Sequence, residues 1–216
     1  MLGEDAIARL EERIRPERAA VIVIDMQNDF VSVRGKMAEF GFETASVRAT
    51  VPLIRALLDA ARSAGFPVIH TRMINDDAQN PPSWRSFWGE PAMTLPGSWG
   101  AEQVVELSPL PGEVVLSKYA YGAFLGTNLD SILRRRRIET LVFAGTDPNI
   151  CAGDTIHQAF ALGYHVVAVS DCLASFSRIG REHAEQLQRM GLYIIENHFG
   201  IAVSSGELIR IMNQAV

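Results

Sequence analysis

Length, composition and charge restrict this chain to a small set of protein classes. Its 216 residues suit a single domain, and 48% hydrophobic against 21% charged residues supply enough apolar side chains for a large core. The net charge of −5 opposes affinity for nucleic acid and for anionic lipid. Two cysteines are too few for a disulfide framework or a thiolate metal site.

The first 17 residues are charged and amphipathic, and they predict a short helix near residues 5–14. They contain none of the apolar core of a signal peptide, and no apolar run in the chain reaches the roughly 20 residues of a membrane-spanning helix. We therefore expect a cytoplasmic protein with no membrane partner.

Strand and helix patterns alternate along the rest of the chain. Continuous apolar, β-branched runs predict strands at 19–25, 66–70, 113–117, 140–145, 164–170 and 192–196. Helical patterns lie at 45–64, 128–136, 151–162, 179–190 and 205–214, with Gly65, Gly163 and Gly191 at expected helix ends. This alternation predicts an α/β fold: a three-layer, doubly wound, mostly parallel six-stranded sheet of the Rossmann-like type.

Polar residues stand at the predicted carboxyl ends of several strands, where parallel sheets place their ligands. They are Asp25, His70, Lys118 and Cys151, the last at a helix start after the segment GTDPNIC. A helix amino terminus and an ammonium both favour a thiolate, and a carboxylate can accept the thiol proton. Asp25, Lys118 and Cys151 thus predict a nucleophilic site whose sulfur is anionic near neutral pH.

Each of these residues also has a purely structural interpretation. Asp25 suits a turn or helix cap, Lys118 an exposed loop, and Cys151 a small buried hydrophobe. It is their conjunction at three strand ends that favours catalysis.

Three motifs in this order resemble the isochorismatase-like cysteine hydrolases over about residues 19–200. VIVIDMQNDF (21–30) is similar to the family's first strand and catalytic aspartate, LSKYAYGAFLGTNLDSIL (116–133) to its lysine segment, and GTDPNICAGDTIHQAFALGYHVVAVSDCLAS (145–175) to its nucleophile block. The resemblance implies one hydrolase domain over residues 1–216. It also implies a triad in which Asp25 takes the thiol proton, Lys118 stabilises charge, and Cys151 forms a covalent intermediate that water releases.

The same resemblance implies an oxyanion hole made by the backbone amides of Asp147 and Cys151, with a cis peptide bond between Thr146 and Asp147. The chain departs from the family pattern at Asp147 and Pro148, which stand where the family has a small apolar residue and a threonine. A carboxylate turned toward the oxyanion hole would weaken it, so the direction of the Asp147 side chain matters.

The segment after the second predicted strand bears on metal binding. Nicotinamidase-type relatives carry an Asp-x-His and a further His there, whereas HTRMINDDAQNPP (70–82) has only His70. The comparison implies neither a metal nor another cofactor.

The end of the first strand and the long connection 71–100 supply candidate substrate contacts. They are Gln27, Phe30, Arg72, Trp84 and Trp88, together with Tyr119 beside Lys118, and Arg85 is a second candidate for binding a carboxylate. Guanidinium and aromatic groups suit a planar acid, so we expect a small amide, carbamoyl or ureido acid as substrate. In the alternative interpretation the arginines are surface charges and the tryptophans pack an interface within a homodimer or homotetramer.

Two other functions remain open on the sequence. One is vinyl ether cleavage, the isochorismatase branch of the family, which does not need the cysteine nucleophile. The other is a non-catalytic or redox-sensitive binding module whose altered GTDPNIC loop has lost the oxyanion hole.

Overall fold

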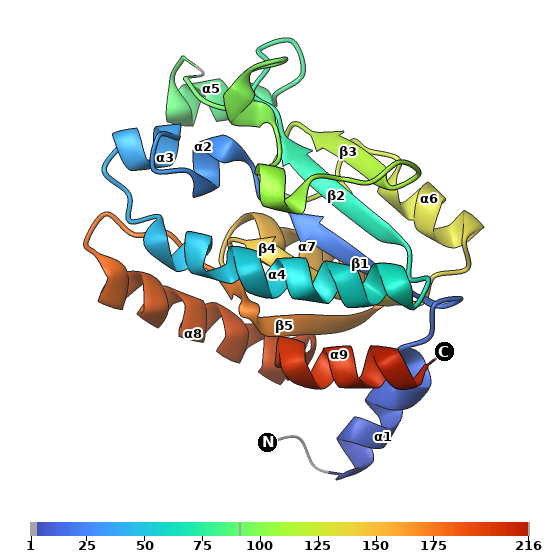
Figure 1. Ribbon diagram of the computed structural model, residues 1–216. Coiled ribbons are helices and arrows are strands. Elements are labelled where there is room, and N and C mark those ends of the chain that lie inside the picture. Colours follow the sequence, from blue (N-terminus) through green and yellow to red (C-terminus); the bar gives the residue numbers. More distant parts are fainter. Residues whose placement is uncertain (1–3, 91, 216) are drawn as a thin grey trace.

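Six strands of the described chain form one parallel sheet. The computed structural model describes residues 4–90 and 92–215. The strands are β1 (Ala19–Ile24), β2 (Val68–Met73), β3 (Val114–Lys118), β4 (Thr140–Thr146), β5 (His165–Ala174) and β6 (Gly200–Val203). They pair in the order β3-β2-β1-β4-β5-β6, and each neighbouring pair is parallel (Figure 1). The expected α/β class and doubly wound sheet are confirmed.

Helices cover both faces of this sheet. They are α1 (Glu4–Arg13), α2 (Asn28–Val31), α3 (Lys36–Glu39), α4 (Ala45–Ser63), α5 (Pro82–Trp88), α6 (Leu129–Arg135), α7 (Cys151–Ala161), α8 (Arg181–His198) and α9 (Ser205–Gln214), with short 3-10 turns η1 (Trp99–Ala101) and η2 (Val105–Leu107). Helices α4 and α9 lie on one face of the sheet (Figure 1). Their side chains pack into one core, and those of α6 and α7 pack into a second core across the sheet. The long connection 71–100 contains the helix α5 and the start of η1.

Strand β1 is completely buried, which explains its continuous apolar sequence. Val21 and Val23 belong to the core beneath α4 and α9, whereas Ile22 and Ile24 belong to the core beneath α6 and α7. Successive side chains of a strand point to opposite faces, so a strand with a core on each side needs an apolar residue at every position.

The sixth strand is not where the sequence pattern predicted it. Residues 192–196 belong to α8, and β6 follows this helix and pairs with β5. Within the run Ile195 is buried, whereas Tyr193 and Ile194 are exposed. One buried side chain among exposed neighbours is the pattern of a surface helix, which a short apolar run does not distinguish from a strand.

Gly191 does not end a helix, contrary to expectation. It lies inside α8, where a Cβ atom would come within 2.9 Å of side-chain atoms of Pro148 and Asn149. The glycine therefore allows α8 to pack closely on the loop that precedes α7.

The strand order reverses between β1 and β4, which are neighbours in the sheet. Asp25 directly follows β1, and Cys151 opens α7 a few residues after β4. Open α/β sheets bind ligands beyond the carboxyl ends of their strands at such a reversal. The topology therefore brings Asp25 and Cys151 to the expected place for a ligand.

Gly145 brings β4 close to β1, and we expect its replacement by alanine to destabilise the fold. Its φ is +117°, and a Cβ atom would lie 2.1 Å from the carbonyl oxygen of Ile24. Gly145→Ala should lower the free energy of unfolding by at least about 2 kcal/mol, measured by urea denaturation. The control Gly206→Ala lies in α9, where a Cβ atom meets nothing within 4 Å, and it should not destabilise the protein. Equal effects of the two substitutions would contradict this prediction.

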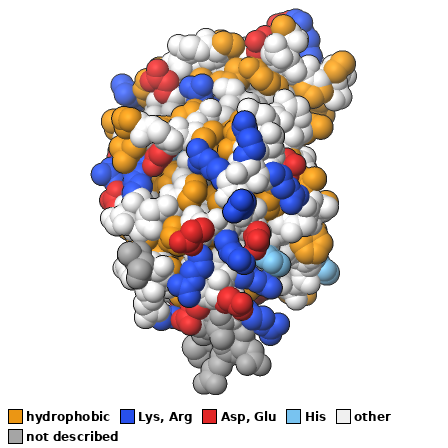
Figure 2. All heavy atoms as spheres, turned by 90° about the vertical axis from the view of Figure 1, so that its right-hand side faces the viewer, with side chains coloured by type: hydrophobic (Ala, Val, Ile, Leu, Met, Phe, Trp, Pro, Cys, Tyr) orange, Lys and Arg blue, Asp and Glu red, His pale blue; other side chains and the backbone are white. Residues whose placement is uncertain are grey.

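The basic run at residues 134–137 lies at the end of α6, on the face shown in Figure 2. Lys and Arg side chains are interspersed with Asp and Glu on this face (Figure 2). Arg134 pairs with Asp130 at 3.2 Å, and it also donates a hydrogen bond to the Leu162 carbonyl. These contacts favour a solvated helix end over a binding patch. Within residues 4–90 and 92–215, no helix has the length and apolar character needed to cross a membrane.

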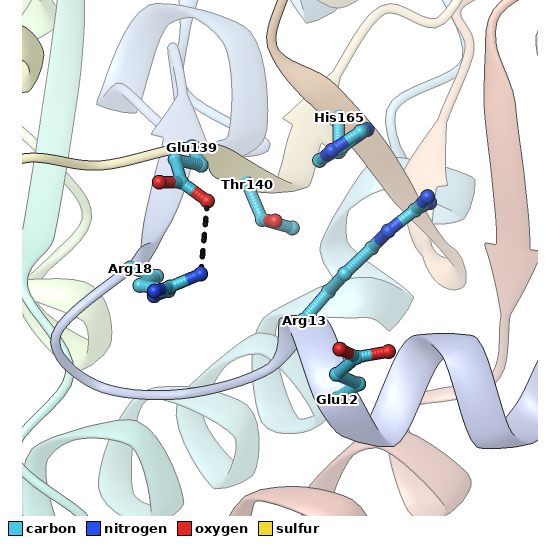
Figure 3. Close-up of a pocket in the computed structure, with 6 residues that line it drawn as sticks. All are labelled: Glu12, Arg13, Arg18, Glu139, Thr140 and His165. Carbon is cyan, nitrogen blue, oxygen red and sulfur yellow. Dashed lines mark hydrogen bonds and ion pairs between the residues drawn. The ribbon is translucent and has the colours of Figure 1, made fainter.

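A hollow of about 230 Å³ lies near the amino ends of β4 and β5 (Figure 3). It is lined by Glu12, Arg13, Arg18, Glu139, Thr140 and His165. Its arginine and glutamate charges balance, and the ion pair between Arg18 and Glu139 is long, at 3.4 Å, and exposed. Parallel sheets bind ligands at the opposite edge, so this hollow is not the expected functional site.

Candidate active site

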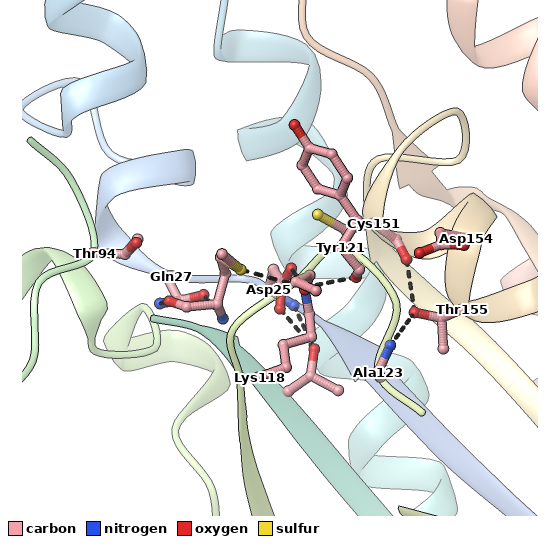
Figure 4. A network of polar contacts seen from close by, with 12 residues as sticks. Asp25, Gln27, Thr94, Lys118, Tyr121, Ala123, Cys151, Asp154 and Thr155 are labelled. Carbon is pink, nitrogen blue, oxygen red and sulfur yellow. Dashed lines mark hydrogen bonds and ion pairs between the residues drawn. The ribbon is translucent and has the colours of Figure 1, made fainter. Parts of the chain in front are cut away.

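A buried ion pair stands at the carboxyl edge of the sheet. Asp25 and Lys118 are both completely buried, and Lys118 Nζ lies 2.7 Å from Asp25 Oδ2. Asp25 follows β1 and Lys118 ends β3, so the ion pair reaches across the end of the intervening strand β2. Figure 4 shows the two side chains gathered with Cys151.

Carbonyl groups of the loop after β3 hold the ammonium of Lys118. Its Nζ donates to the carbonyls of Ala120, at 3.1 Å, and Tyr121, at 2.8 Å. Burial by itself lowers the pKa of Lys118, but the neighbouring acidic groups, first of all the carboxylate of Asp25, outweigh it and raise the pKa above its ordinary value. Lys118 is therefore a fixed positive charge beside the sulfur.

Cys151 is the first residue of α7, and its side chain is nearly buried, with 9% of the residue exposed. Thr155, one turn further along α7, donates a hydrogen bond to the Cys151 carbonyl at 2.7 Å and accepts one from the Ala123 amide at 3.1 Å (Figure 4). This bridge ties the start of α7 to the loop after β3, and so the sulfur is held in the same region as Lys118.

The thiol of Cys151 is not a preformed thiolate, contrary to the expectation from the sequence. Burial raises the pKa of Cys151; Lys118 lowers it, and the carboxylate of Asp25 raises it further. The net direction is upward, because burial removes the water that would solvate the anion and a second negative charge stands close by. The resting thiol carries its proton at neutral pH.

The carboxylate of Asp25 has one oxygen available for that proton. Oδ1 accepts a hydrogen bond from the Thr71 hydroxyl at 2.7 Å. Oδ2 is buried and forms the ion pair with Lys118 Nζ at 2.7 Å. Because Thr71 occupies Oδ1, Oδ2 is the oxygen that can accept the thiol proton.

The loop before Cys151 contains a cis peptide bond between Thr146 and Asp147, at the position that the family resemblance implies. The carboxylate of Asp147 accepts hydrogen bonds from the amide of Asn149 at 2.8 Å, the hydroxyl of Ser175 at 2.9 Å and the amide of Phe176 at 3.2 Å. Asp147 is thus bound to its own loop and to the end of β5. Its carboxylate is occupied there and does not serve the thiol.

Aromatic side chains from distant segments surround the site. The rings of Trp84 and Tyr121 lie 4.6 Å apart, and Trp88 Nε1 donates to the Tyr121 hydroxyl at 2.9 Å. On the other side, the rings of Phe30 and Phe176 are 6.1 Å apart. Three of these, Phe30, Trp84 and Trp88, are predicted contacts, and the structure brings them near the ion pair or the nucleophile loop.

Sequence reasoning missed Tyr121, Phe176 and Thr71. Tyr121 stands three residues after Lys118, in the motif that carries the lysine. This short distance in the sequence could have identified it as a site residue. Thr71 gave no comparable signal, because its contact with Asp25 depends on the pairing of β1 with β2.

Gln27 does not face the substrate, contrary to expectation. It is completely buried, its Nε2 donates to the carbonyls of Met73 and Ala101, and its Oε1 accepts from the Met73 amide. Both ends of the side-chain amide are therefore used to clamp the loop after β1 to neighbouring segments.

Arg72 and Tyr119 also lie away from the triad residues. They line a separate hollow of about 230 Å³ together with Ser117, whose hydroxyl accepts a hydrogen bond from Arg72 at 3.2 Å. Side chains alternate along a strand, so Thr71 faces Asp25 while Arg72 points to the opposite face of the sheet. Arg85 pairs with Asp77 and Glu90 on the surface, which supports its interpretation as a surface charge.

His70 is buried on that opposite face, where its Nε2 lies 3.0 Å from Glu113. Burial lowers the pKa of His70, and Glu113 only partly offsets this. Across residues 4–90 and 92–215, no three His, Cys, Asp or Glu side chains are grouped in a way that could hold a metal ion.

Fold and site together define a doubly wound α/β protein with a carboxylate, an ammonium and a thiol gathered where the strand order reverses. A family model described as the Isochorismatase domain matches residues 19–204. The chain belongs to this family, as its three motifs indicated.

Named relatives and solved structures agree with this membership. The ureidoacrylate amidohydrolase RutB of Agrobacterium fabrum is 29% identical, covering 94% of this chain and 93% of the relative. That of Caulobacter segnis is 33% identical, covering 87% and 82%. A cysteine hydrolase from Pseudomonas syringae pv. phaseolicola superposes with a TM-score of 0.85 at 30% identity, covering 94% of this chain and 96% of that one. An N-carbamoylsarcosine amidase from Thermoplasma acidophilum gives 0.71 at 28%, covering 87% and 96%.

Proposed function

We propose that this protein is a cysteine hydrolase that cleaves a carbon-nitrogen bond of a small ureido or carbamoyl acid, with Asp25, Lys118 and Cys151 as its catalytic residues. The observation that carries this proposal is the buried carboxylate of Asp25, which pairs with the Lys118 ammonium at 2.7 Å and has the Cys151 thiol beside it. Relatives named for ureidoacrylate and for N-carbamoylsarcosine support the substrate class.

The raised pKa of Cys151 defines the first step. Because the thiol holds its proton at rest, Asp25 Oδ2 removes the proton as the sulfur attacks the ureido carbonyl carbon. A new carbon-sulfur bond forms, and the carbonyl oxygen becomes an oxyanion. Lys118 remains charged and balances the negative charge in the buried site.

The amides of Asp147 and Cys151 are our candidates for the oxyanion hole. The neighbouring amides of Ile150, Ala152 and Gly153 all donate to the Asp147 carbonyl. In the described residues, the amides of Asp147 and Cys151 make no such loop hydrogen bond. Free amides beside the nucleophile are suited to stabilise an oxyanion.

The remaining steps return the enzyme to its starting state. Protonated Asp25 gives its proton to the leaving nitrogen, the carbon-nitrogen bond breaks, and a thiocarbamate remains on Cys151. Water then attacks the thiocarbamate carbon while Asp25 takes one of its protons, and the carbon-sulfur bond breaks to give a carbamate and the thiol. Asp25 returns that proton to the sulfur. If the substituted nitrogen leaves first, the carbamate breaks down to ammonia and carbon dioxide; if ammonia leaves first, the carbamate breaks down to an amine and carbon dioxide.

A substrate panel tests the proposed function. We expect ammonia release from ureidoacrylate and N-carbamoylsarcosine, and a mass increase on the Cys151 peptide when the reaction is quenched early. Maleamate represents simple acid amides, and isochorismate represents vinyl ethers. Cleavage of isochorismate without ammonia release from any nitrogen substrate would overturn the proposal, as would the absence of turnover on the whole panel.

We also propose that the chain forms a homodimer or homotetramer through α8. Met190, Tyr193 and Ile194 are exposed apolar residues on this helix, and Ile150 is exposed on the loop against which α8 packs. Tyr193→Glu should therefore shift the mass measured by light scattering after gel filtration toward that of a monomer. The control Val105→Glu changes an even more exposed apolar residue on η2 and should leave the mass unchanged. A monomeric wild-type protein would contradict this prediction.

A further inference from the structure

Thr71 makes two hydrogen bonds to Asp25. Its hydroxyl donates to Asp25 Oδ1 at 2.7 Å and accepts from the Asp25 backbone amide at 3.2 Å. A hydroxyl has a single hydrogen, so it donates in one contact and accepts in the other, and the two contacts together fix the direction of its O–H bond. Thr71 is completely buried in β2, where water does not compete for these contacts.

The backbone of Asp25 is in an unusual conformation. Its φ is +51°, in the left-handed region that residues with a side chain adopt only at an energetic cost. A conformation of this kind persists when its surroundings hold it in place. The Thr71 hydroxyl binds both the backbone amide and the carboxylate of Asp25. It therefore fixes the orientation of the carboxylate relative to the turn after β1.

The charged and titratable groups around Asp25 make this direction important. Lys118 approaches Oδ2 from β3, and the Cys151 thiol faces the carboxylate from α7. The Lys118 ammonium also donates to the carbonyls of Ala120 and Tyr121. Thr71 and Lys118 thus contact different oxygens of Asp25, and Thr71 fixes which oxygen faces Lys118 and the thiol.

We propose that Thr71 is a positioning residue of the reaction: it occupies Oδ1 of Asp25 and so presents Oδ2 to the thiol of Cys151. This inference rests on the proposed function, in which Asp25 is the base. Without the hydroxyl, the carboxylate loses one hydrogen bond and gains the freedom to turn. It then presents Oδ2 to the thiol less often and accepts the thiol proton less often.

The test uses three variants. Thr71→Val has nearly the shape of threonine without its hydroxyl, and Thr71→Ser restores a hydroxyl. The control Thr140→Val removes a hydroxyl from another buried strand threonine, which lies at the amino end of β4, far from the triad. For each protein, kcat/KM for ammonia release from ureidoacrylate is measured between pH 5 and pH 9, and thermal unfolding is recorded alongside.

For Thr71→Val we expect kcat to fall about 10- to 100-fold with little change in KM, and the kcat/KM profile to change shape, because proton transfer from Cys151 to Asp25 is altered and substrate binding is not. Thr71→Ser should recover most of the rate and the wild-type profile. A Thr71→Val profile that keeps its wild-type shape, or a loss no larger than that of Thr140→Val, would overturn the proposal.

Failure of the proposed function itself gives a different result. If the wild-type protein releases no ammonia, the alkylation of Cys151 by iodoacetamide, followed on its peptide by mass spectrometry, still reports how Asp25 acts on the thiol. Thr71→Val should then change the pH dependence of alkylation, whereas Thr140→Val should not. Identical pH dependences in wild-type and Thr71→Val protein would overturn the role of Thr71 independently of any substrate.

Discussion

Replacing Cys151 with alanine is expected to abolish ammonia release from every ureido and carbamoyl substrate, with a loss of about 10,000-fold or more. The loss is large because the thiol forms the covalent bond to the substrate, and alanine has no nucleophilic group. Asp25 and Lys118 remain in this variant, but Asp25 has no thiol from which to take a proton. The measurement is the steady-state rate of ammonia release, together with the mass of the quenched protein, which should show no adduct.

Cys172→Ala is the matched control. Cys172 is the other cysteine of the chain, and it is completely buried within β5. Its replacement should lower stability slightly and leave the rate unchanged. Ammonia release that survives in Cys151→Ala would mean that water attacks the substrate directly, and the covalent mechanism would be wrong.

Replacing Lys118 with methionine should destabilise the protein and stop catalysis together. Methionine fills nearly the same space but removes the charge, so the carboxylate of Asp25 is left buried without its partner. Breaking one side of a buried ion pair typically lowers the free energy of unfolding by about 3–5 kcal/mol. The rate should fall at least about 100-fold, since no positive charge then balances the anionic intermediate. Urea denaturation and ammonia release are the two measurements.

A second substitution separates the two effects. In Asp25→Asn combined with Lys118→Met both charges are gone, so part of the lost stability should return while activity remains absent. The control Lys36→Met removes an exposed lysine that pairs with Glu39 on α3, and it should change neither quantity appreciably. A Lys118→Met protein with wild-type stability would show that the pair is not held as the structure describes.

The amino-acid sequence by itself determined the fold class and the candidates for chemistry. Continuous apolar strands alternating with amphipathic helices are sufficient for a doubly wound sheet, because each strand must be buried on both faces. The motifs around Asp25, Lys118 and Cys151 could be recognised because each stands at the end of such a strand or at the helix that follows it. The structure then brings these three side chains together at the edge where the strand order reverses.

Local sequence was not sufficient where the outcome depends on close packing. The run at residues 192–196 is apolar enough for a strand, yet it belongs to α8, whose Gly191 packs closely on the loop before α7. A glycine that ends a helix and a glycine that permits a close contact look the same in the sequence.

Only the tertiary structure decided the directions of the side chains and the protonation of the Cys151 thiol. The side-chain amide of Gln27 binds backbone groups of distant segments. Arg72 lies on the opposite face of the sheet from Thr71. The Cys151 thiol stays protonated although a helix start and a lysine favour its anion. The physical reason is the same in each case: hydrogen-bond partners and loss of solvent come from segments far apart in the chain, and they outweigh what a residue's own neighbours in sequence predict.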